Sequence, residues 1–373
     1  MSRAVFYGIL TAIGLLFMRI LYLFSGYRSV LIEKVEKGED PGGGTWGLMA
    51  LRSLGHTADI VELEQWFPPK VAQYLRFNVF GIYGAHLPFF LRFFSYDVIF
   101  TAGAFTSQLL FTFLKSIFRF KRPLWVMHDF SIMSLLGDGH TMKQKIFEYI
   151  VSRADGIVTL GRSEAERLGE RFPHLRERIE FIPYGVDTEA FAPRTQEKER
   201  MILAVGIDPD RDWDTFFAAC EGLNARVVVA GSRQRTSNFN PPSYVEGRHY
   251  TLDELLDLYA KAAVVVLPLD TSSGVNDAMG CSTVSESLST GNAVVASHTH
   301  TMESYITDGE NGLLVPEGDV RAMRTAIVRV LDDEALQIRL GSAARAYALE
   351  HLKVRDKAAE LAAFFERLIA DVE

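Results

Sequence analysis

Short apolar runs alternate with helix-like stretches along most of this chain. In the first half, runs rich in β-branched and aromatic side chains predict strands at residues 29–33, 59–63, 96–100, 124–128, 156–160 and 179–183. Helical patterns fill several intervals, and at 163–171 Ser163 and Glu166 have the spacing of a capping box. Such alternation is typical of a parallel sheet with crossover helices. We therefore predict a Rossmann-like first half.

The same plan repeats in the second half, after a polar stretch at 192–199 that predicts a linker. The strands predicted there are residues 201–206, 226–231, 263–268 and 293–297. Residues 333–371 have apolar positions at helical spacing and no strand pattern. At 373 residues the chain is long enough for two domains, which we bound at 28–195 and 196–373. Two facing α/β domains leave a central cleft, and ligands of such folds collect at the carboxyl ends of the strands.

The N-terminal residues follow a different pattern. Residues 4–24 are an almost unbroken apolar run, long enough to cross a bilayer as a helix. We expect residues 1–27 to form a membrane anchor that is retained, because no small-residue cleavage site follows the run. Basic residues lie mostly on its carboxyl side, at Arg19, Arg28, Lys34 and Lys37. That bias predicts a folded body on the cytoplasmic face, while Arg19 inside the run leaves a buried or interfacial helix as the alternative.

Composition narrows the classes of partner and cofactor. The formal net charge of -8 argues against a nucleic-acid binder, which needs a basic face. Cys220 and Cys281 lie far apart and have no CxxC spacing, so the sequence predicts neither a disulfide framework nor a zinc site. No DxD-like pair of carboxylates stands out on a suitable loop. We therefore predict no metal.

Three segments carry candidate chemistry. The loop at 41–45, Pro-Gly-Gly-Gly-Thr, precedes a predicted helix, where backbone amides can approach a phosphate or a sugar; a flexible turn is the alternative. His128 ends a predicted strand and can hydrogen-bond a substrate hydroxyl, although a lone histidine is often structural. Glu286 lies on a predicted helix just before a Gly-Asn turn. One carboxylate accepts from both hydroxyls of a ribose diol, but the spacing alone also fits a solvated glutamate.

Several stretches, in order, resemble the family-four retaining GT-B glycosyltransferases, which are part of the glycosyl transferase group 1 superfamily. In the first half these are PGGGTWGLMALRSLGHTADIVEL, ADGIVTLGRSEAERL and IEFIPYGVDTEAF. In the second half they are YTLDELLDLYAKAAVVVLPL, STVSESLSTGNAVVAS and MESYITDGENGLLVPEGD. The resemblance covers nearly everything after residue 28. It implies an α/β fold of the GT-B class, in which two Rossmann-like domains face a central cleft. The predicted N-terminal hydrophobic helix precedes these domains in the chain.

The resemblance also implies roles for individual residues. Glu286 would hold the nucleotide ribose, and His128 would touch the donor sugar as a catalytic residue. The phosphate or acceptor loop would be made by Gly42, Gly43 and Gly44. The donor side would further include Gly206, Ser282 and Thr283.

Two positions depart from the family pattern. The first of the family's paired glutamates would fall at Ala278, which has no carboxylate. The preceding loop, 272–277, offers Asn276 and Asp277 as catalytic substitutes, and which group replaces the glutamate stays open. The family's diphosphate-binding arginine aligns with Ile207. Because a guanidinium fork suits a pyrophosphate, our substitute is Arg211; the weaker candidates are Arg233 and Lys261.

The function implied by the resemblance is sugar transfer from a UDP- or GDP-linked donor, with retention at the anomeric carbon and no separate cofactor. Charge on the leaving group would be neutralised by cationic side chains and helix N-termini. Two alternatives stay open: a sugar-nucleotide epimerase of the same architecture, and a catalytically silent GT-B scaffold. The predicted anchor argues against the epimerase.

Two aromatic segments bear on the acceptor. Residues 74–94 and 105–122 are crowded with phenylalanine and interleaved with arginine and lysine, a composition that favours a bilayer interface with anionic head groups. For 105–118 ordinary helix core is the favoured interpretation. For 74–94, which contains Arg76 and Arg92, we expect membrane contact. A lipid-linked or other membrane acceptor is the partner that this predicts.

Overall fold

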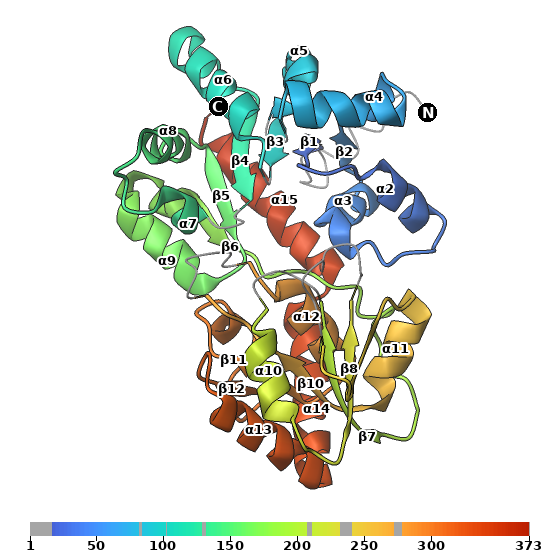
Figure 1. Cartoon of the computed structure of the whole chain (residues 1–373). Helices are drawn as coiled ribbons and strands as arrows, with labels where there is room; N and C mark the ends of the chain where they lie inside the picture. The colour runs from blue at the N-terminus through green and yellow to red at the C-terminus, as the bar shows by residue number, and fades with distance from the viewer. Residues whose placement is uncertain are drawn as a thin grey trace. The chain divides into compact units, whose positions relative to one another are not determined.

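The computed structural model describes residues 17–81, 84–101, 103–128, 132–206, 211–231, 241–271 and 278–372. The chain divides into two compact units (Figure 1). Unit 1 comprises the described residues up to Thr159, Ala165–Ile182 and the chain from Ala358 onward, and unit 2 comprises Leu160–Glu164 and Pro183–Lys357. The second domain predicted at 196–373 thus differs at its end, because the last helix returns to unit 1.

Unit 1 is built on a six-stranded parallel sheet in the order β2-β1-β3-β4-β5-β6. Its strands are β1 (Arg19–Leu23), β2 (Thr57–Ile60), β3 (Val98–Thr101), β4 (Leu124–His128), β5 (Gly156–Thr159) and β6 (Ile179–Phe181). The inner strands β3, β4 and β5 are buried along their whole length, as expected for a parallel sheet with helices on both faces. The strands predicted from residue 59 onward in this half are confirmed to within a few residues.

The N-terminal predictions need correction. Arg19–Leu23 is strand β1, not part of a membrane helix; it pairs with β2 and β3 and is buried from Ile20 onward. A strand covered on both faces and a bilayer-spanning helix are both continuous apolar runs, so hydrophobicity alone does not separate them. Residues 4–16 of the predicted anchor lie outside the described part of the chain. The strand predicted at 29–33 is instead helix α2 (Ser29–Glu36).

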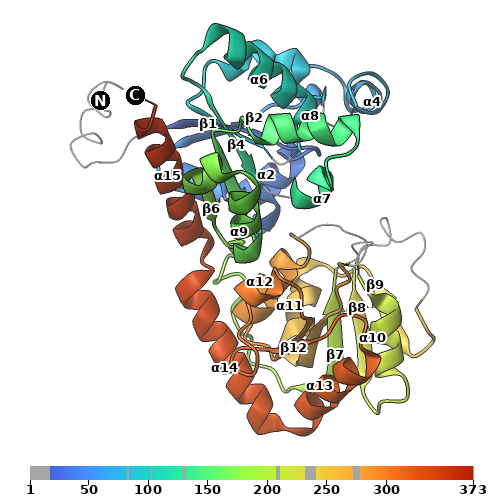
Figure 2. The same ribbon diagram turned by 90° about the vertical axis from the view of Figure 1, so that its left-hand side faces the viewer.

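Helices cover both faces of the first sheet (Figure 2). One face packs against α2, α3 (Leu48–Ser53) and the C-terminal helix α15 (Val354–Ala370). The helices of the other face are α4 (Pro69–Tyr74), α5 (Phe90–Phe93), α6 (Phe105–Phe118), α7 (Ile132–Leu136), α8 (Met142–Val151) and α9 (Arg162–Arg171). The short helical turns of this unit are η1 (Gly43–Thr45), η2 (Leu63–Gln65), the π-helical η3 (Leu75–Val79), η5 (Leu87–Phe89) and η6 (Pro173–Arg178).

Unit 2 repeats the plan with a six-stranded parallel sheet in the order β12-β11-β10-β7-β8-β9. Its strands are β7 (Glu199–Val205), β8 (Arg226–Ala230), β9 (Val245–Arg248), β10 (Ala262–Leu267), β11 (Val294–Ser297) and β12 (Leu313–Val315). The four predicted strands are confirmed. The edge strands β9 and β12 were not predicted: Val245–Arg248 has one buried residue and Leu313–Val315 is three residues long.

The described helices of unit 2 are α10 (Trp213–Cys220), α11 (Leu252–Lys261), α12 (Cys281–Ser289), η8 (Met302–Ser304), α13 (Val320–Asp332) and α14 (Glu334–His351). Four of them begin at side chains that suit helix N-termini. Thr251 and Glu254 form a capping box on α11, and Asp212, Asp319 and Asp333 accept from backbone amides at the starts of α10, α13 and α14. The face of the sheet that carries α10 and α13 holds a separate apolar core.

No helix within the described residues is long and apolar enough to span a bilayer.

Candidate functional site

The glycine loop of unit 1 is a tight turn between α2 and α3. Gly42 and Gly47 have φ values of 82° and 80°, in the left-handed region that favours glycine. The Gly42 amide donates to Asp40 Oδ1 at 2.8 Å, so it is already satisfied within the loop. At Gly44 a Cβ atom would lie 2.7 Å from Leu31 Cδ2. The local structure therefore explains two of the three predicted glycines by turn geometry and by packing on α2.

The fold brings His128 beside this loop. His128 ends β4 and its ring lies edge-on to Trp46, with centroids 4.8 Å apart, and to Phe100, with centroids 5.3 Å apart. Trp46 has the left-handed φ of 52°, which is uncommon for a bulky residue, and its carbonyl accepts from Tyr22 Oη at 3.1 Å. A small hollow is lined by Tyr22, Leu23, Phe24, Trp46, Phe100 and His128. The position predicted for donor-sugar contact is therefore a nearly buried imidazole in an aromatic enclosure.

Neither Trp46 nor Tyr22 was predicted as a site residue. Trp46 lies next to the glycine loop in the sequence, and that adjacency was the available signal. Tyr22 lies in the run interpreted as a membrane helix, so its place at the carboxyl end of β1 was hidden by that interpretation. Burial raises the pKa of the Tyr22 phenol, which therefore stays a neutral hydrogen-bond donor.

In unit 2, Arg211 reaches the start of α12. Its Nη2 donates to Thr283 Oγ1 at 3.1 Å, and the residue is 5% exposed. Arg211 also bridges to Leu269, just beyond β10, and its positive charge lowers the pKa of the nearby Tyr259, although burial and Glu286 raise that pKa more. Gly206 follows β7 with a φ of 103°, and a Cβ atom there would lie 2.7 Å from Arg211 Nη2. Only glycine fits that position without displacing the guanidinium.

Glu286 belongs to the same cluster. It lies one turn beyond Thr283 on α12, is half-buried, and its Oε2 accepts from Tyr259 Oη at 3.3 Å. Tyr259 is fully buried on α11. The predicted donor residues Gly206, Arg211, Ser282, Thr283 and Glu286 thus come from the loops after β7 and from the first two turns of α12. A guanidinium, two hydroxyls and a carboxylate gathered there suit a ribose and a diphosphate.

Other predicted residues are not brought into this cluster. Lys261 lies at the opposite edge of the sheet, where its Nζ is 3.3 Å from Glu199 Oε1 at the start of β7; it stays apart from the cluster because α11 ends at the amino ends of the strands. Asn276 and Asp277, with the loop 272–277, lie outside the described residues, as do Ile207 and Arg233. Ala278 is described and supplies no carboxylate.

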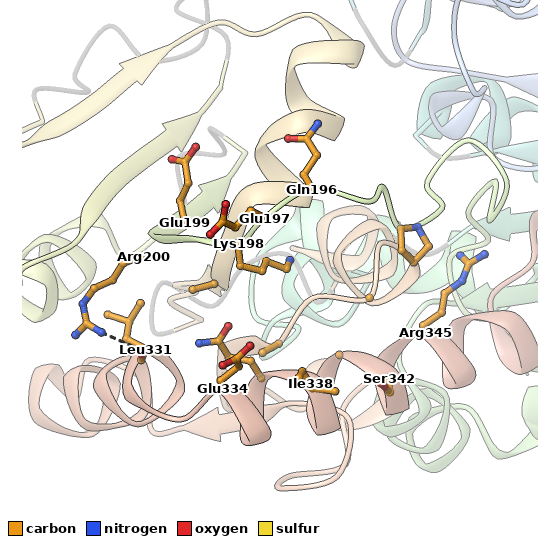
Figure 3. A pocket seen from close by; sticks show the side chains of 16 residues that line it. Gln196, Glu197, Lys198, Glu199, Arg200, Leu331, Glu334, Ile338, Ser342 and Arg345 are labelled. Atoms are coloured by element: carbon orange, nitrogen blue, oxygen red, sulfur yellow. Dashed lines mark hydrogen bonds between the residues drawn. The ribbon is translucent and has the colours of Figure 1, made fainter.

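Unit 2 also contains a hollow of about 970 Å³ that lies away from the donor cluster (Figure 3). It lies between the linker residues 193–200 and helix α14, at the amino ends of β7 and β10. Lys198 lines it and donates to Asn292 Oδ1 at 2.9 Å, and burial lowers its pKa to about 8. Because the donor cluster lies at the other ends of these strands, this hollow is a separate feature. Among the described residues no group of three or more His, Cys, Asp or Glu side chains forms a metal site.

The fold of the whole chain matches solved GT-B glycosyltransferase structures. Sucrose-phosphate synthase from Thermosynechococcus elongatus superposes with a TM-score of 0.66 at 17% identity, over 95% of this chain and 100% of that chain. HepE from Anabaena, solved in complex with UDP, gives a TM-score of 0.64 at 13% identity, over 94% of this chain and 100% of that chain. The fold is therefore of the GT-B class.

Family models identify both domains. Residues 48–190 match Glycosyltransferase Family 4, and residues 199–333 match Glycosyl transferases group 1. These two segments are therefore similar to the two domains of glycosyltransferases of the GT4/group 1 kind.

Curated relatives are similar over part of their length. The D-inositol 3-phosphate glycosyltransferase of Corynebacterium glutamicum is 24% identical over 261 residues, which is 60% of each chain. The GDP-mannose-dependent alpha-(1-6)-phosphatidylinositol monomannoside mannosyltransferase of Mycolicibacterium smegmatis is 27% identical over 235 residues, 56% of this chain and 61% of that protein. The chain thus spans about 60% of the length of these two relatives.

Proposed function

We propose that this protein transfers a sugar from a UDP- or GDP-linked donor to a membrane-associated, lipid-linked acceptor, with retention of anomeric configuration. The observation that carries the proposal is the cluster of Arg211, Thr283 and Glu286 in unit 2. They were selected from sequence for the donor side, Arg211 for the diphosphate and Glu286 for the ribose. Arg211 hydrogen-bonds Thr283, and Glu286 follows Thr283 by one turn on the same helix, α12.

The chemistry of the cluster supports a nucleotide-sugar donor. The Glu286 carboxylate is an acceptor-only group when ionised, so it suits the two donating hydroxyls of a ribose. The Arg211 guanidinium suits the charge that develops on the departing diphosphate. Thr283 orients that guanidinium by accepting one of its N–H groups.

In the proposed reaction the bond between the anomeric carbon and the diphosphate oxygen breaks, and the acceptor hydroxyl oxygen bonds to the same carbon. The hydroxyl proton leaves with the diphosphate or to solvent. In unit 1, His128 would contact the donor sugar from its aromatic enclosure. In the loop 272–277, Asn276 and Asp277 are the proposed substitutes for the glutamate absent at Ala278.

The acceptor proposal is supported by two observations. The mannosyltransferase relative is named for GDP-mannose and for phosphatidylinositol monomannoside, a lipid, and unit 1 has a surface rich in exposed aromatic and basic side chains. We propose that the body of the protein works on the cytoplasmic face. Cys220 and Cys281 are buried and form no disulfide, which is compatible with a reducing compartment.

A thermal-shift screen of the full chain against UDP- and GDP-sugars tests the donor, with Glu286→Ala as the control. Stabilisation by one donor that the variant loses supports the proposed ribose contact, whereas no stabilisation by any donor contradicts the proposal. Incubation of that donor with a lipid extract then separates the alternatives. Release of nucleoside diphosphate excludes a silent scaffold, and label transferred to lipid excludes an epimerase.

A further inference from the structure

One side of unit 1 is unusually apolar and basic. Residues 66–123 contain one acidic residue, Asp97, and seven basic ones, in a chain whose net charge is -8. Helices α4, α5 and α6 of this segment lie at the top of unit 1 in Figure 1, and α4 and α6 lie at the top of unit 1 again in Figure 2. We call the surface formed by α4, η3, α5 and α6 the aromatic-basic face.

Aromatic contacts join these elements into one surface. The Trp66 ring, just before α4, lies 4.2 Å from Phe89 at the start of α5. Phe94, just after α5, lies 5.3 Å from Phe120 and 6.5 Å from Phe111 of α6. Since Trp66 and Phe94 are themselves about half exposed, the contacts run along the surface and not only through the core.

Large apolar side chains project from each element of the face. Leu91 of α5 is 85% exposed, Phe118 of α6 is 70% exposed and Tyr74 of α4 is 61% exposed. On α6, Phe113 and Ile117 continue the exposed stripe, opposite the buried Phe111. Exposed residues at this density mark a surface that contacts another phase or partner. Helix α6 therefore has an exposed apolar stripe in addition to the core-facing side expected from its sequence.

The charges of the face favour an anionic occupant. Arg76, Lys115 and Arg122 are neutralised by ion pairs with Glu64, Asp155 and Asp97. By contrast, Lys70, Arg92 and Arg119 are exposed and form no ion pair with any described residue. These unpaired cations come from α4, α5 and the end of α6, so they are spread among the exposed aromatic side chains.

We propose that the aromatic-basic face binds the surface of an anionic lipid bilayer. Its apolar side chains would enter the head-group region, and Lys70, Arg92 and Arg119 would pair with lipid phosphates. A second copy of the chain fits less well, because two such faces would bring six unpaired cations together. The inference rests on the proposed function only in taking the bilayer as the source of the acceptor.

Vesicle co-sedimentation of the full chain tests the binding without any transfer reaction. The wild type should bind phosphatidylglycerol vesicles far better than phosphatidylcholine vesicles, and less well as salt is raised. Arg92→Gln with Arg119→Gln should weaken binding roughly 30-fold, since each cation contributes about fivefold. The matched control is Arg321→Gln with Arg329→Gln, exposed positions on α13 of unit 2, which should change binding by less than about twofold.

A second pair of variants tests the apolar part of the face. Leu91→Ser with Phe118→Ser should weaken vesicle binding at least about tenfold, whereas Ile338→Ser, 62% exposed on α14, should leave it unchanged. Unfolding midpoints near that of the wild type show that the variants are folded. The proposal would be overturned if the wild type does not bind anionic vesicles, or if the variants of the face bind them as well as the wild type does.

Light scattering tests whether the face binds a second copy of the chain instead of a bilayer. The proposal would be overturned if the wild type is a dimer that binds no vesicles and the double variant Leu91→Ser with Phe118→Ser is a monomer. That result would assign the face to a second copy of the chain. Donor hydrolysis, measured on the same preparations without lipid, is expected to be equal in all variants. Loss of vesicle binding with intact hydrolysis therefore separates this inference from the proposed transfer reaction.

Discussion

Arg211 Nη2 and Thr283 Oγ1 lie 3.1 Å apart, and this hydrogen bond joins the loop after β7 to the first turn of α12. The two residues are 72 positions apart in the sequence. Gly206 keeps the space beside the guanidinium clear, because any Cβ atom there would come within 2.7 Å of Nη2. The fold thus holds one buried guanidinium at the first turn of α12, the helix that also carries Glu286.

If Arg211 neutralises the diphosphate, Arg211→Met should weaken UDP or GDP binding about 10- to 100-fold, the range of one charge-assisted hydrogen bond. Arg211→Lys should recover part of the loss, since it keeps the charge without the planar fork. Thr283→Val should have a severalfold effect, because it removes only the orienting acceptor. Calorimetric titration of each folded variant measures these affinities, and unchanged binding by Arg211→Met would exclude this role.

If Glu286 binds the ribose, the affinity for the nucleotide should depend on the ribose hydroxyls. The wild type should bind a 2′-deoxynucleoside diphosphate about tenfold more weakly than the ribonucleotide, because one hydroxyl is lost. In Glu286→Ala the two ligands should bind equally, since no carboxylate remains to distinguish them. Tyr259→Phe, which removes the hydroxyl that donates to Glu286 Oε2, is the control and should retain the preference. A preference that survives in Glu286→Ala would assign the ribose to another group.

The packing of α15 on unit 1 gives a prediction about stability. At Gly156, on β5, a Cβ atom would lie 2.5 Å from Leu368 Cδ1 and 3.0 Å from Phe364 Cζ. Gly156→Ala should therefore lower the free energy of unfolding by about 1–3 kcal/mol, the usual effect of overpacking. Gly169→Ala is the control, because its Cβ atom would meet Arg176 at an ordinary 3.5 Å; on helix α9 it should raise that free energy by about 0.5–1 kcal/mol. Urea unfolding measures both, and equal effects would contradict the packing argument.

The sequence predicted most strands of both sheets because the inner strands of a parallel sheet are buried on both faces and rich in β-branched residues. The same property made β1 ambiguous: Arg19–Leu23 extends an apolar run that also has the length of a membrane helix. The edge strand β9, Val245–Arg248, escaped prediction because it buries only Val245. In unit 2, strand patterns therefore predicted the four inner strands and missed both edge strands, whereas in unit 1 they predicted both edges, β2 and β6, and missed the inner strand β1.

The donor cluster was predictable in its residues and not in its contacts. Glu286 and Arg211 were selected by family position and by the chemistry of a diphosphate, but the part of Thr283 in orienting Arg211 depends on how α12 lies against the loop after β7. That Lys261 lies at the amino end of β7, away from the cluster, depends on the direction of α11. Trp46 was missed because its left-handed backbone and its contact with His128 follow from the packing of the whole unit.

His86 makes unit 1 sensitive to acid. Its Nε2 lies 2.8 Å from the Phe24 carbonyl oxygen, the geometry of a neutral imidazole donating there, while Nδ1 is buried with no partner among the described residues. Burial lowers the pKa of His86 to about 4. Between the ordinary pKa of about 6.5 and pH 4, the unfolded chain therefore takes up a proton that the folded chain does not, so falling pH destabilises the fold.

The shift corresponds to about 3 kcal/mol lost from the free energy of unfolding across that pH range. His86→Gln keeps an N–H donor for the Phe24 carbonyl and does not titrate, so its stability should fall less on acidification. Urea unfolding of the wild type and the variant at pH 7.0 and at about pH 4.5 measures the difference. Because other groups titrate identically in both proteins, parallel losses in the two would show that His86 stays protonated or solvated in the folded chain, contrary to its buried contact with Phe24.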